Sequence, residues 1–147
     1  MARIEHEVLI DRRVGDVFAF AVDPDRVPEW QPGVVWMRQT TPGRFGLGSR
    51  IAQTRVLHGR RFDIIVECDG YEPDARFGLR MVSGPVAGRM VTTFEAVGTC
   101  TRVRLAADVS VTGPLRVLEP LLDRAARREL VADCLRLKRA LEGAAGP

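Results

Sequence analysis

Six β-rich segments follow one another with only short turns between them, and this run limits the possible folds more than any other feature. They cover residues 34–37, 50–58, 62–71, 77–82, 90–97 and 103–112. Gly, Pro and Asp occupy the gaps, for example Pro42-Gly43 and Ser83-Gly84-Pro85. Because parallel neighbours need a long crossover connection, such short gaps permit hairpins only. The sequence therefore predicts an antiparallel meander.

Alternation shows that one face of this sheet is buried. In the last segment Val103 and Leu105 alternate with Arg102 and Arg104, so apolar and polar side chains point to opposite faces. The chain opens with a similar pattern, in which Ile4, His6, Val8 and Ile10 alternate with Arg3, Glu5, Glu7 and Leu9. This predicts an additional first strand, in which His6 is half-buried, and a sheet of six to seven strands.

Two short helices are predicted after the first strand. The first is indicated by apolar residues at helical spacing, Val14, Val17, Phe18 and Ala21. Asp23 and Pro24 then suit the N-cap and first position of a second helix, which would run from Pro24 to Trp30.

A single long amphipathic helix is predicted over about residues 115–142. Its apolar stripe consists of Leu118, Leu122, Ala125, Ala126, Leu130, Cys134, Leu137 and Leu141. Pro120 falls inside the pattern and would either kink the helix or mark its start, and we expect the kink. With 147 residues, the chain is expected to form one α+β domain.

The helix must bury its stripe, and the dry face of the sheet is the only large apolar surface available. A strongly twisted sheet curls away from a straight helix, which leaves a gap. Only 6% of the residues are aromatic, so large side chains fill this gap poorly. The sequence therefore predicts a cavity for a small, mostly apolar molecule.

The chain resembles the SRPBCC or START-like superfamily of helix-grip proteins, and within it the polyketide cyclase/dehydrase and lipid-transport group. The resemblance spans about residues 3–142 and rests on Val8-Leu9-Ile10-Asp11-Arg12, Val14-Gly15-Asp16-Val17-Phe18, Asp23-Pro24 to Glu29-Trp30, Gly48-Ser49-Arg50, Tyr71-Glu72-Pro73, Thr93-Phe94-Glu95, Thr101-Arg102-Val103 and Leu135-Arg136-Leu137-Lys138. It implies a curved sheet wrapped on a long C-terminal helix. It also implies an apolar-ligand cavity without specifying a reaction.

The inward face of this arrangement supplies the candidate ligand-binding residues. They are Trp30, Ile64, Val66, Phe77, Leu79, Met81, Met90, Thr92, Phe94, Leu105, Leu118, Leu122, Ala126 and Leu130. For each of them, ordinary core packing is the alternative interpretation. Met81 and Met90 suit an adaptable pocket because a thioether side chain is flexible.

The strand that holds Gln53 and Arg55 can be placed in two registers. In one, both side chains enter the cavity, and the buried guanidinium then needs a carboxylate or carbonyl on the ligand, or a protein acid such as Glu129. In the other, both lie on the surface, while Ala52 and Thr54 face inward. The pattern leaves both registers open.

No catalytic motif is evident in the sequence. His58 lies at an expected hairpin tip, and Asp63, Glu67 and Asp69 fall on the outward face. The three cysteines and two histidines lack metal-ligand spacing, so no metal and no cofactor are expected. A carrier of a lipid, isoprenoid, quinone or polyketide-like metabolite is therefore the first hypothesis. A cyclase, dehydratase or aromatase is the second, with Arg55, Gln53, Thr92 and Trp30 as the candidate catalytic residues.

Composition limits the partners. The net charge is +3, which does not indicate a nucleic-acid binder. Neither a membrane-spanning run nor an apolar secretory signal is found, so we expect a cytoplasmic monomer or homodimer that takes a small hydrophobic molecule. The arginines Arg124, Arg127 and Arg128 suit a solvated helix face, and a docking patch for an acidic partner or a membrane is a third hypothesis.

Overall fold

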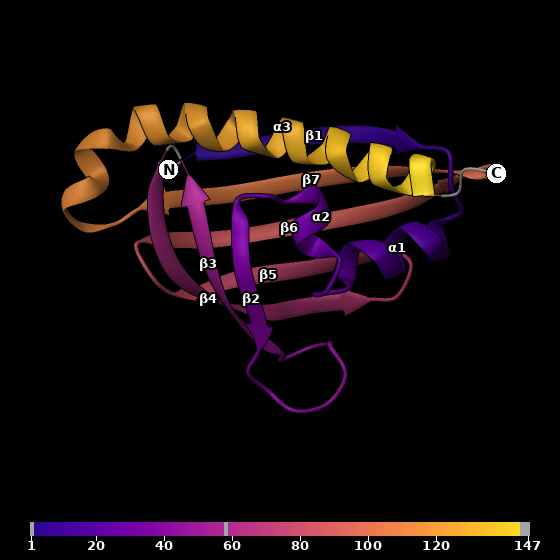
Figure 1. The fold of residues 1–147 in the computed structure, drawn as a ribbon, viewed down its shortest axis with the longest axis horizontal. Coiled ribbons are helices and arrows are strands. Elements are labelled where there is room, and N and C mark those ends of the chain that lie inside the picture. The colour runs from indigo at the N-terminus through magenta and orange to yellow at the C-terminus, as the bar shows by residue number, and fades with distance from the viewer. Residues whose placement is uncertain (1, 58, 145–147) are drawn as a thin grey trace.

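The predicted sheet is present and has seven strands. A computed structural model describes residues 2–57 and 59–144 (Figure 1). The strands pair antiparallel in the order β1-β7-β6-β5-β4-β3-β2. Their bounds are β1 Ala2–Ile10, β2 Val34–Gln39, β3 Arg50–Leu57, β4 Arg60–Glu72, β5 Arg76–Ser83, β6 Val86–Val97 and β7 Cys100–Val111. From β2 to β7 each strand pairs with the next one along the chain, as the short gaps predict.

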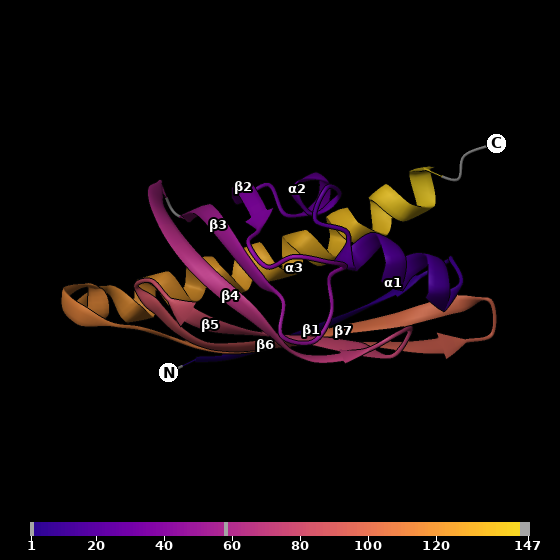
Figure 2. The ribbon, with the colours of Figure 1, turned by 90° about the horizontal axis from the view of Figure 1, so that it is seen from below.

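All helices lie on one side of the sheet. They are α1 (Val14–Val22), α2 (Val27–Trp30), the 3-10 helix η1 (Gly113–Leu118) and α3 (Glu119–Ala144). Figure 2 shows α3 crossing the concave side, with β3 and β4 curling up beside it. Between β4 and β5 the register shifts near Gly70, which pairs with Gly78, and such a shift bends a sheet. Within the described residues, the structure contains no helix that is long and apolar enough to span a membrane.

The predicted start of the second helix was wrong by three residues. Asp23 does accept a backbone hydrogen bond, but from Asp25 N–H at 3.0 Å through its side chain. Its carbonyl accepts from the N–H groups of Arg26 and Val27. An aspartate side chain that accepts a hydrogen bond from the backbone N–H two residues later favours a turn. Residues 24–26 therefore form a turn, and α2 begins only at Val27.

Pro120 marks the start of the long helix, so the predicted kink was wrong. The segment from Gly113 to Leu118 winds as a 3-10 helix, and α3 begins at Glu119. Pro120 therefore lies in the first turn, where a backbone N–H has no intrahelical partner and its absence costs nothing.

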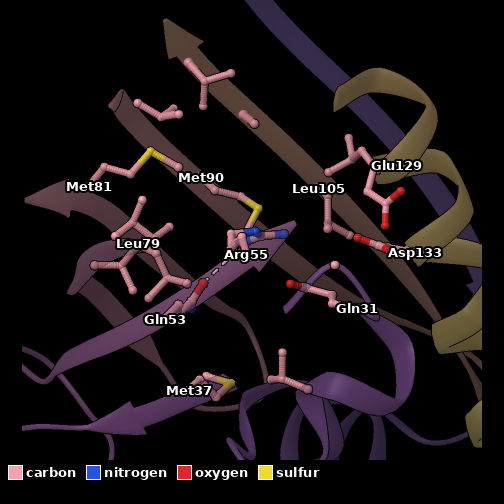
Figure 3. A pocket seen from close by; sticks show the side chains of 18 of the residues that line it. Gln31, Met37, Gln53, Arg55, Leu79, Met81, Met90, Leu105, Glu129 and Asp133 are labelled. Atoms are coloured by element: carbon pink, nitrogen blue, oxygen red, sulfur yellow. Dashed lines mark hydrogen bonds between the residues drawn. The ribbon is translucent and has the colours of Figure 1, made fainter. Parts of the chain in front are cut away.

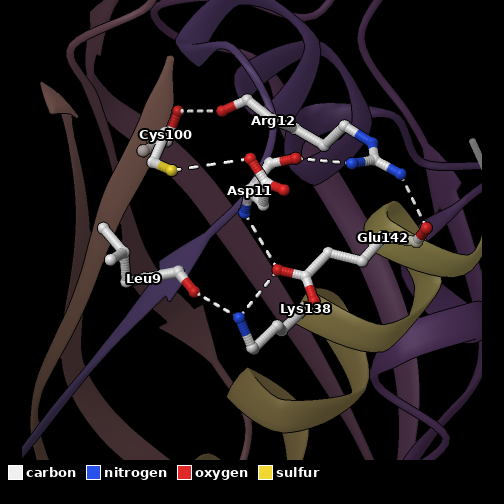
Figure 4. A network of polar contacts seen from close by, with 7 residues as sticks. Leu9, Asp11, Arg12, Cys100, Lys138 and Glu142 are labelled. Carbon is white, nitrogen blue, oxygen red and sulfur yellow. Dashed lines mark hydrogen bonds and ion pairs between the residues drawn. The ribbon is translucent and has the colours of Figure 1, made fainter. Parts of the chain in front are cut away.

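The C-terminal half of α3 is fixed to the end of β1 by a polar network (Figure 4). Lys138 Nζ donates to the Leu9 carbonyl at 2.6 Å and to Glu142 Oε2 at 2.7 Å. The Asp11 N–H donates to the same Glu142 oxygen at 2.9 Å, and Arg12 Nη2 donates to the Glu142 carbonyl at 2.6 Å. This end of the helix is consequently held against the sheet.

Arginines on the convex face of the sheet are matched by acids. Glu67 accepts hydrogen bonds from Arg50 at 3.0 Å and from Arg80 at 2.7 Å, and Asp69 accepts from Arg89 at 3.1 Å. The outward orientation predicted for Asp63, Glu67 and Asp69 is thus confirmed. These pairs are exposed to solvent and each contributes little to stability, but they give Arg50, Arg80 and Arg89 an acidic partner.

Candidate functional site

A cavity of about 170 Å³ lies between the concave face of the sheet and the helices α2 and α3. Most of the predicted ligand-binding side chains border it. These are Trp30, Ile64, Val66, Phe77, Leu79, Met81, Met90, Leu105, Ala126 and Leu130. The gap that the sheet curvature predicts is therefore present in the fold.

Four predicted residues do not border this cavity. Thr92 and Phe94 are buried in the packed core, where the Phe94 ring lies 5.1 Å from that of Phe18. Helix α1 inserts Phe18 at this end of the concave face and so fills it. Leu118 is 37% exposed, because it belongs to the 3-10 helix η1 and not to α3, whose apolar stripe faces the sheet. Leu122 borders a second cavity instead.

The structure decides the register of β3: Gln53 and Arg55 both face the cavity (Figure 3). Gln53 is only 5% exposed, and it pairs with Met37 of β2 and Ile64 of β4. Arg55 Nη1 donates to Gln53 Oε1 at 3.5 Å, which is the only side-chain hydrogen bond Arg55 makes within the described residues.

Sequence reasoning missed part of the polar lining. Asp133 and Gln31 point into the same space as Arg55 and Gln53, together with Glu129, which was considered only as a possible partner of Arg55 (Figure 3). Asp133 lies on the apolar stripe of α3, three residues after Leu130. An acidic residue on the buried face of an amphipathic helix indicates a polar group in the interior, so the sequence pattern could have identified it. Gln31 lies just after α2 and offers no comparable pattern.

The carboxyl group of Asp133 is strongly perturbed. Burial raises its pKa to about 7, and the negative charge of Glu129 adds to the shift. Arg55 and Arg136 offset part of this effect. The contact with Arg136 is direct, because its Nη1 donates to Asp133 Oδ1 at 2.8 Å. Asp133 thus changes its charge near neutral pH while only 4% exposed.

Arg55 faces the cavity without a direct ion pair to any described residue. Burial lowers the pKa of its guanidinium, and the charges of Asp133 and Glu129 offset part of that shift. An arginine side chain still keeps its proton in a protein. Both acids instead contact Arg136, Glu129 at 3.6 Å. The N–H groups of Arg55 are therefore available to an oxygen acceptor inside a mostly apolar cavity.

A second cavity of about 340 Å³ adjoins the first at the start of α3. The two share their lining at Leu57, Phe62, Val86, Val109 and Ala126. Arg60, Arg61 and Leu122 border only the second one. We take it as the mouth of the site. His58, predicted as a turn residue, lies outside the described residues.

A curved sheet closed by a C-terminal helix over a lined cavity defines the helix-grip class, to which START-like proteins belong. The family model for polyketide cyclase / dehydrase and lipid transport matches residues 1–142. The chain belongs to this family. No curated protein matches the sequence.

Solved structures show the same fold. The protein TTHA0849 of Thermus thermophilus has a TM-score of 0.85 at 17% identity, covering 99% of this chain and 100% of that chain. A START superfamily protein of Mycobacterium smegmatis has a TM-score of 0.83 at 15% identity over 97% and 98%. The Zhui aromatase/cyclase of Streptomyces sp. R1128 has a TM-score of 0.82 at 15% identity over 99% of both chains. At such identities the likeness concerns the fold alone.

Proposed function

We propose that this protein binds or carries a small hydrophobic molecule that bears an oxygen acceptor, such as a carboxylate, a phenolate or a polarised carbonyl. The observation that carries the proposal is Arg55, a half-buried cation whose donors face a mostly apolar cavity without a direct ion pair among the described residues. A buried guanidinium is costly unless an acceptor satisfies it. Gln53 and Gln31 offer further polar groups beside it.

The volume of the inner cavity limits the size of the ligand group that it can hold. A cavity of roughly 150 Å³ is known to hold a single benzene ring, and the inner cavity measures about 170 Å³. We propose that one ring or a short branched chain occupies it, near the flexible side chains of Met37, Met81 and Met90. The rest of the molecule would extend past Ala126 into the second cavity.

Ala126→Phe should abolish ligand uptake without unfolding the protein. Ala126 borders both cavities, so a phenyl group at this position fills empty space between them. Ala132→Phe is the matched control, because Ala132 lies on the same helix but borders neither cavity. Fluorescence titration with the neutral probe N-phenyl-1-naphthylamine measures uptake. The proposal is wrong if the wild-type protein takes up no probe, or if both variants bind it as the wild type does.

A cyclase-type reaction is the second candidate, and Asp133 is the residue that favours it. A general base works best when its pKa is near the working pH, and burial brings the pKa of Asp133 to about 7. Its carboxylate would take a proton from a carbon acid next to a carbonyl. Arg55 would donate hydrogen bonds to the enolate oxygen that forms.

Product analysis by mass spectrometry tests this candidate. The wild-type protein should convert a short poly-β-ketone thioester faster than buffer does. Asp133→Asn should lose the reaction yet still bind N-phenyl-1-naphthylamine, because the amide has nearly the same volume as the carboxyl group. Equal rates with the wild type, with the variant and without protein would rule the enzyme out and leave the carrier.

A further inference from the structure

Exposed arginines without an ion pair lie at and near the mouth of the cavity. Arg60 and Arg61 border the mouth on β4. Arg124 and Arg128 lie on the same part of α3 but two residues after Leu122 and Ala126, on the side of the helix that faces away from the mouth. None of these four makes a side-chain hydrogen bond or ion pair within the described ranges 2–57 and 59–144. On the convex face, by contrast, Arg50 and Arg80 are paired with Glu67, and Arg89 is paired with Asp69.

Few acids offset this positive charge. Among the described residues that line the mouth, Asp123 is the only acid. Glu119 lies at the same end of the molecule and keeps its negative charge, but it does not line the mouth. The lining itself, with Arg60 and Arg61 against Asp123, therefore carries a net positive charge.

Exposed apolar side chains lie at the same end. Val117 of η1 is 84% exposed and Leu121 of α3 is 53% exposed. Both precede Leu122, which borders the mouth itself. In Figures 1 and 2, η1 and the start of α3 project from the end of the molecule where the β3–β4 hairpin also lies. Apolar and basic side chains thus share one rim.

We propose that this rim docks on an anionic lipid surface and so opens the cavity toward the bilayer. Val117 and Leu121 would enter the boundary between headgroups and acyl chains, while Arg60 and Arg61 would contact the acidic headgroups. Charge complementarity favours this occupant, because a combination of basic and apolar side chains matches a membrane interface. A hydrophobic molecule could then enter without crossing water.

Vesicle co-sedimentation tests the electrostatic part. The wild-type protein should bind vesicles made from a roughly 3:1 mixture of phosphatidylcholine and phosphatidylserine, and higher salt should weaken this binding. Arg60→Gln with Arg61→Gln should weaken it about 25-fold, at roughly fivefold for each arginine. Arg38→Gln with Arg44→Gln is the matched control, because this pair is also exposed, has no ion pair among the described residues and lies away from the mouth. It should bind almost as the wild type does.

A second pair of variants tests the apolar part. Val117→Ser with Leu121→Ser should weaken binding at least tenfold, because less apolar surface enters the bilayer. Leu47→Ser with Val97→Ser alters exposed apolar residues elsewhere and should change little. In solution without vesicles, Val117→Ser with Leu121→Ser should still take up N-phenyl-1-naphthylamine, because neither residue borders either cavity, and this separates docking from ligand binding.

Three results would overturn the proposal. In the first, the wild-type protein does not sediment with the acidic vesicles. In the second, each variant and its matched control lose binding equally, which indicates unspecific attraction. In the third, only the arginine variant loses binding, which indicates electrostatic adsorption to the vesicles without entry of Val117 and Leu121 into the bilayer.

Discussion

Raising the pH from about 5 to about 8 should destabilise this protein, and Asp133 should be the cause. The ordinary pKa of an aspartate carboxyl group is 3.8, and the pKa of Asp133 in the folded chain is about 7. Between these values the folded state holds a proton that the unfolded state releases, so the free energy of unfolding falls as the pH rises. Between pH 5 and pH 8 this loss amounts to at most roughly 2.5 kcal/mol, out of a total of roughly 4 kcal/mol over the whole pH range.

Urea unfolding midpoints across this pH range measure the effect. Asp133→Asn should remove most of the decline, because the amide carries no charge at any of these pH values. The variant should match the wild type at acid pH and exceed its stability at alkaline pH. Asp25→Asn, at an exposed position, should keep the decline of the wild type. A wild-type midpoint that stays level or rises with pH would contradict the assignment.

Arg55→Met should weaken the binding of anionic ligands by roughly 10- to 100-fold. A hydrogen bond to a charged group contributes about 1.5–3 kcal/mol, and a methionine side chain keeps most of the apolar volume of arginine. The anionic probe 1-anilinonaphthalene-8-sulfonate and the neutral N-phenyl-1-naphthylamine have similar ring systems. The neutral probe should bind the variant about as well as it binds the wild-type protein.

Slightly acid pH suits this comparison, because Asp133 is then protonated and its charge no longer repels an anionic probe. Arg38→Met removes an exposed arginine on β2 and serves as the control, with no expected change for either probe. If Arg55→Met weakens both probes equally, the substitution has reshaped the cavity. The proposed contact between Arg55 and an oxygen acceptor would then be wrong.

Local sequence patterns were sufficient for the elements of the fold. Alternation in the chain from Val103 onward and the apolar stripe of α3 each depend on neighbours a few residues apart. Such patterns predicted the strands and the three α-helices, but not the 3-10 helix η1. The errors at Pro24 and Pro120 concern where helices begin. Before α2 a turn, and before α3 a 3-10 helix, provides hydrogen-bond partners for the backbone, so each α-helix begins at a different residue from the one predicted.

The lining of the cavity was only partly predictable. A strand pattern shows which side chains share a face, and this placed Met81 and Met90 correctly at the cavity. The same pattern does not show which part of that face is covered by a helix and which part borders the cavity. Phe94 therefore met Phe18 of α1 instead of open space.

The sequence alone determined an antiparallel meander, its buried face and its closing helix, because these depend on periodicity within single segments. Only the tertiary structure decided that β3 turns Arg55 inward and that Asp133 of α3 lies near it. The physical reason is that the charge state of a buried group depends on the groups around it in space. Arg55 and Asp133 belong to distant segments, so their meeting depends on how the sheet curves around the helix.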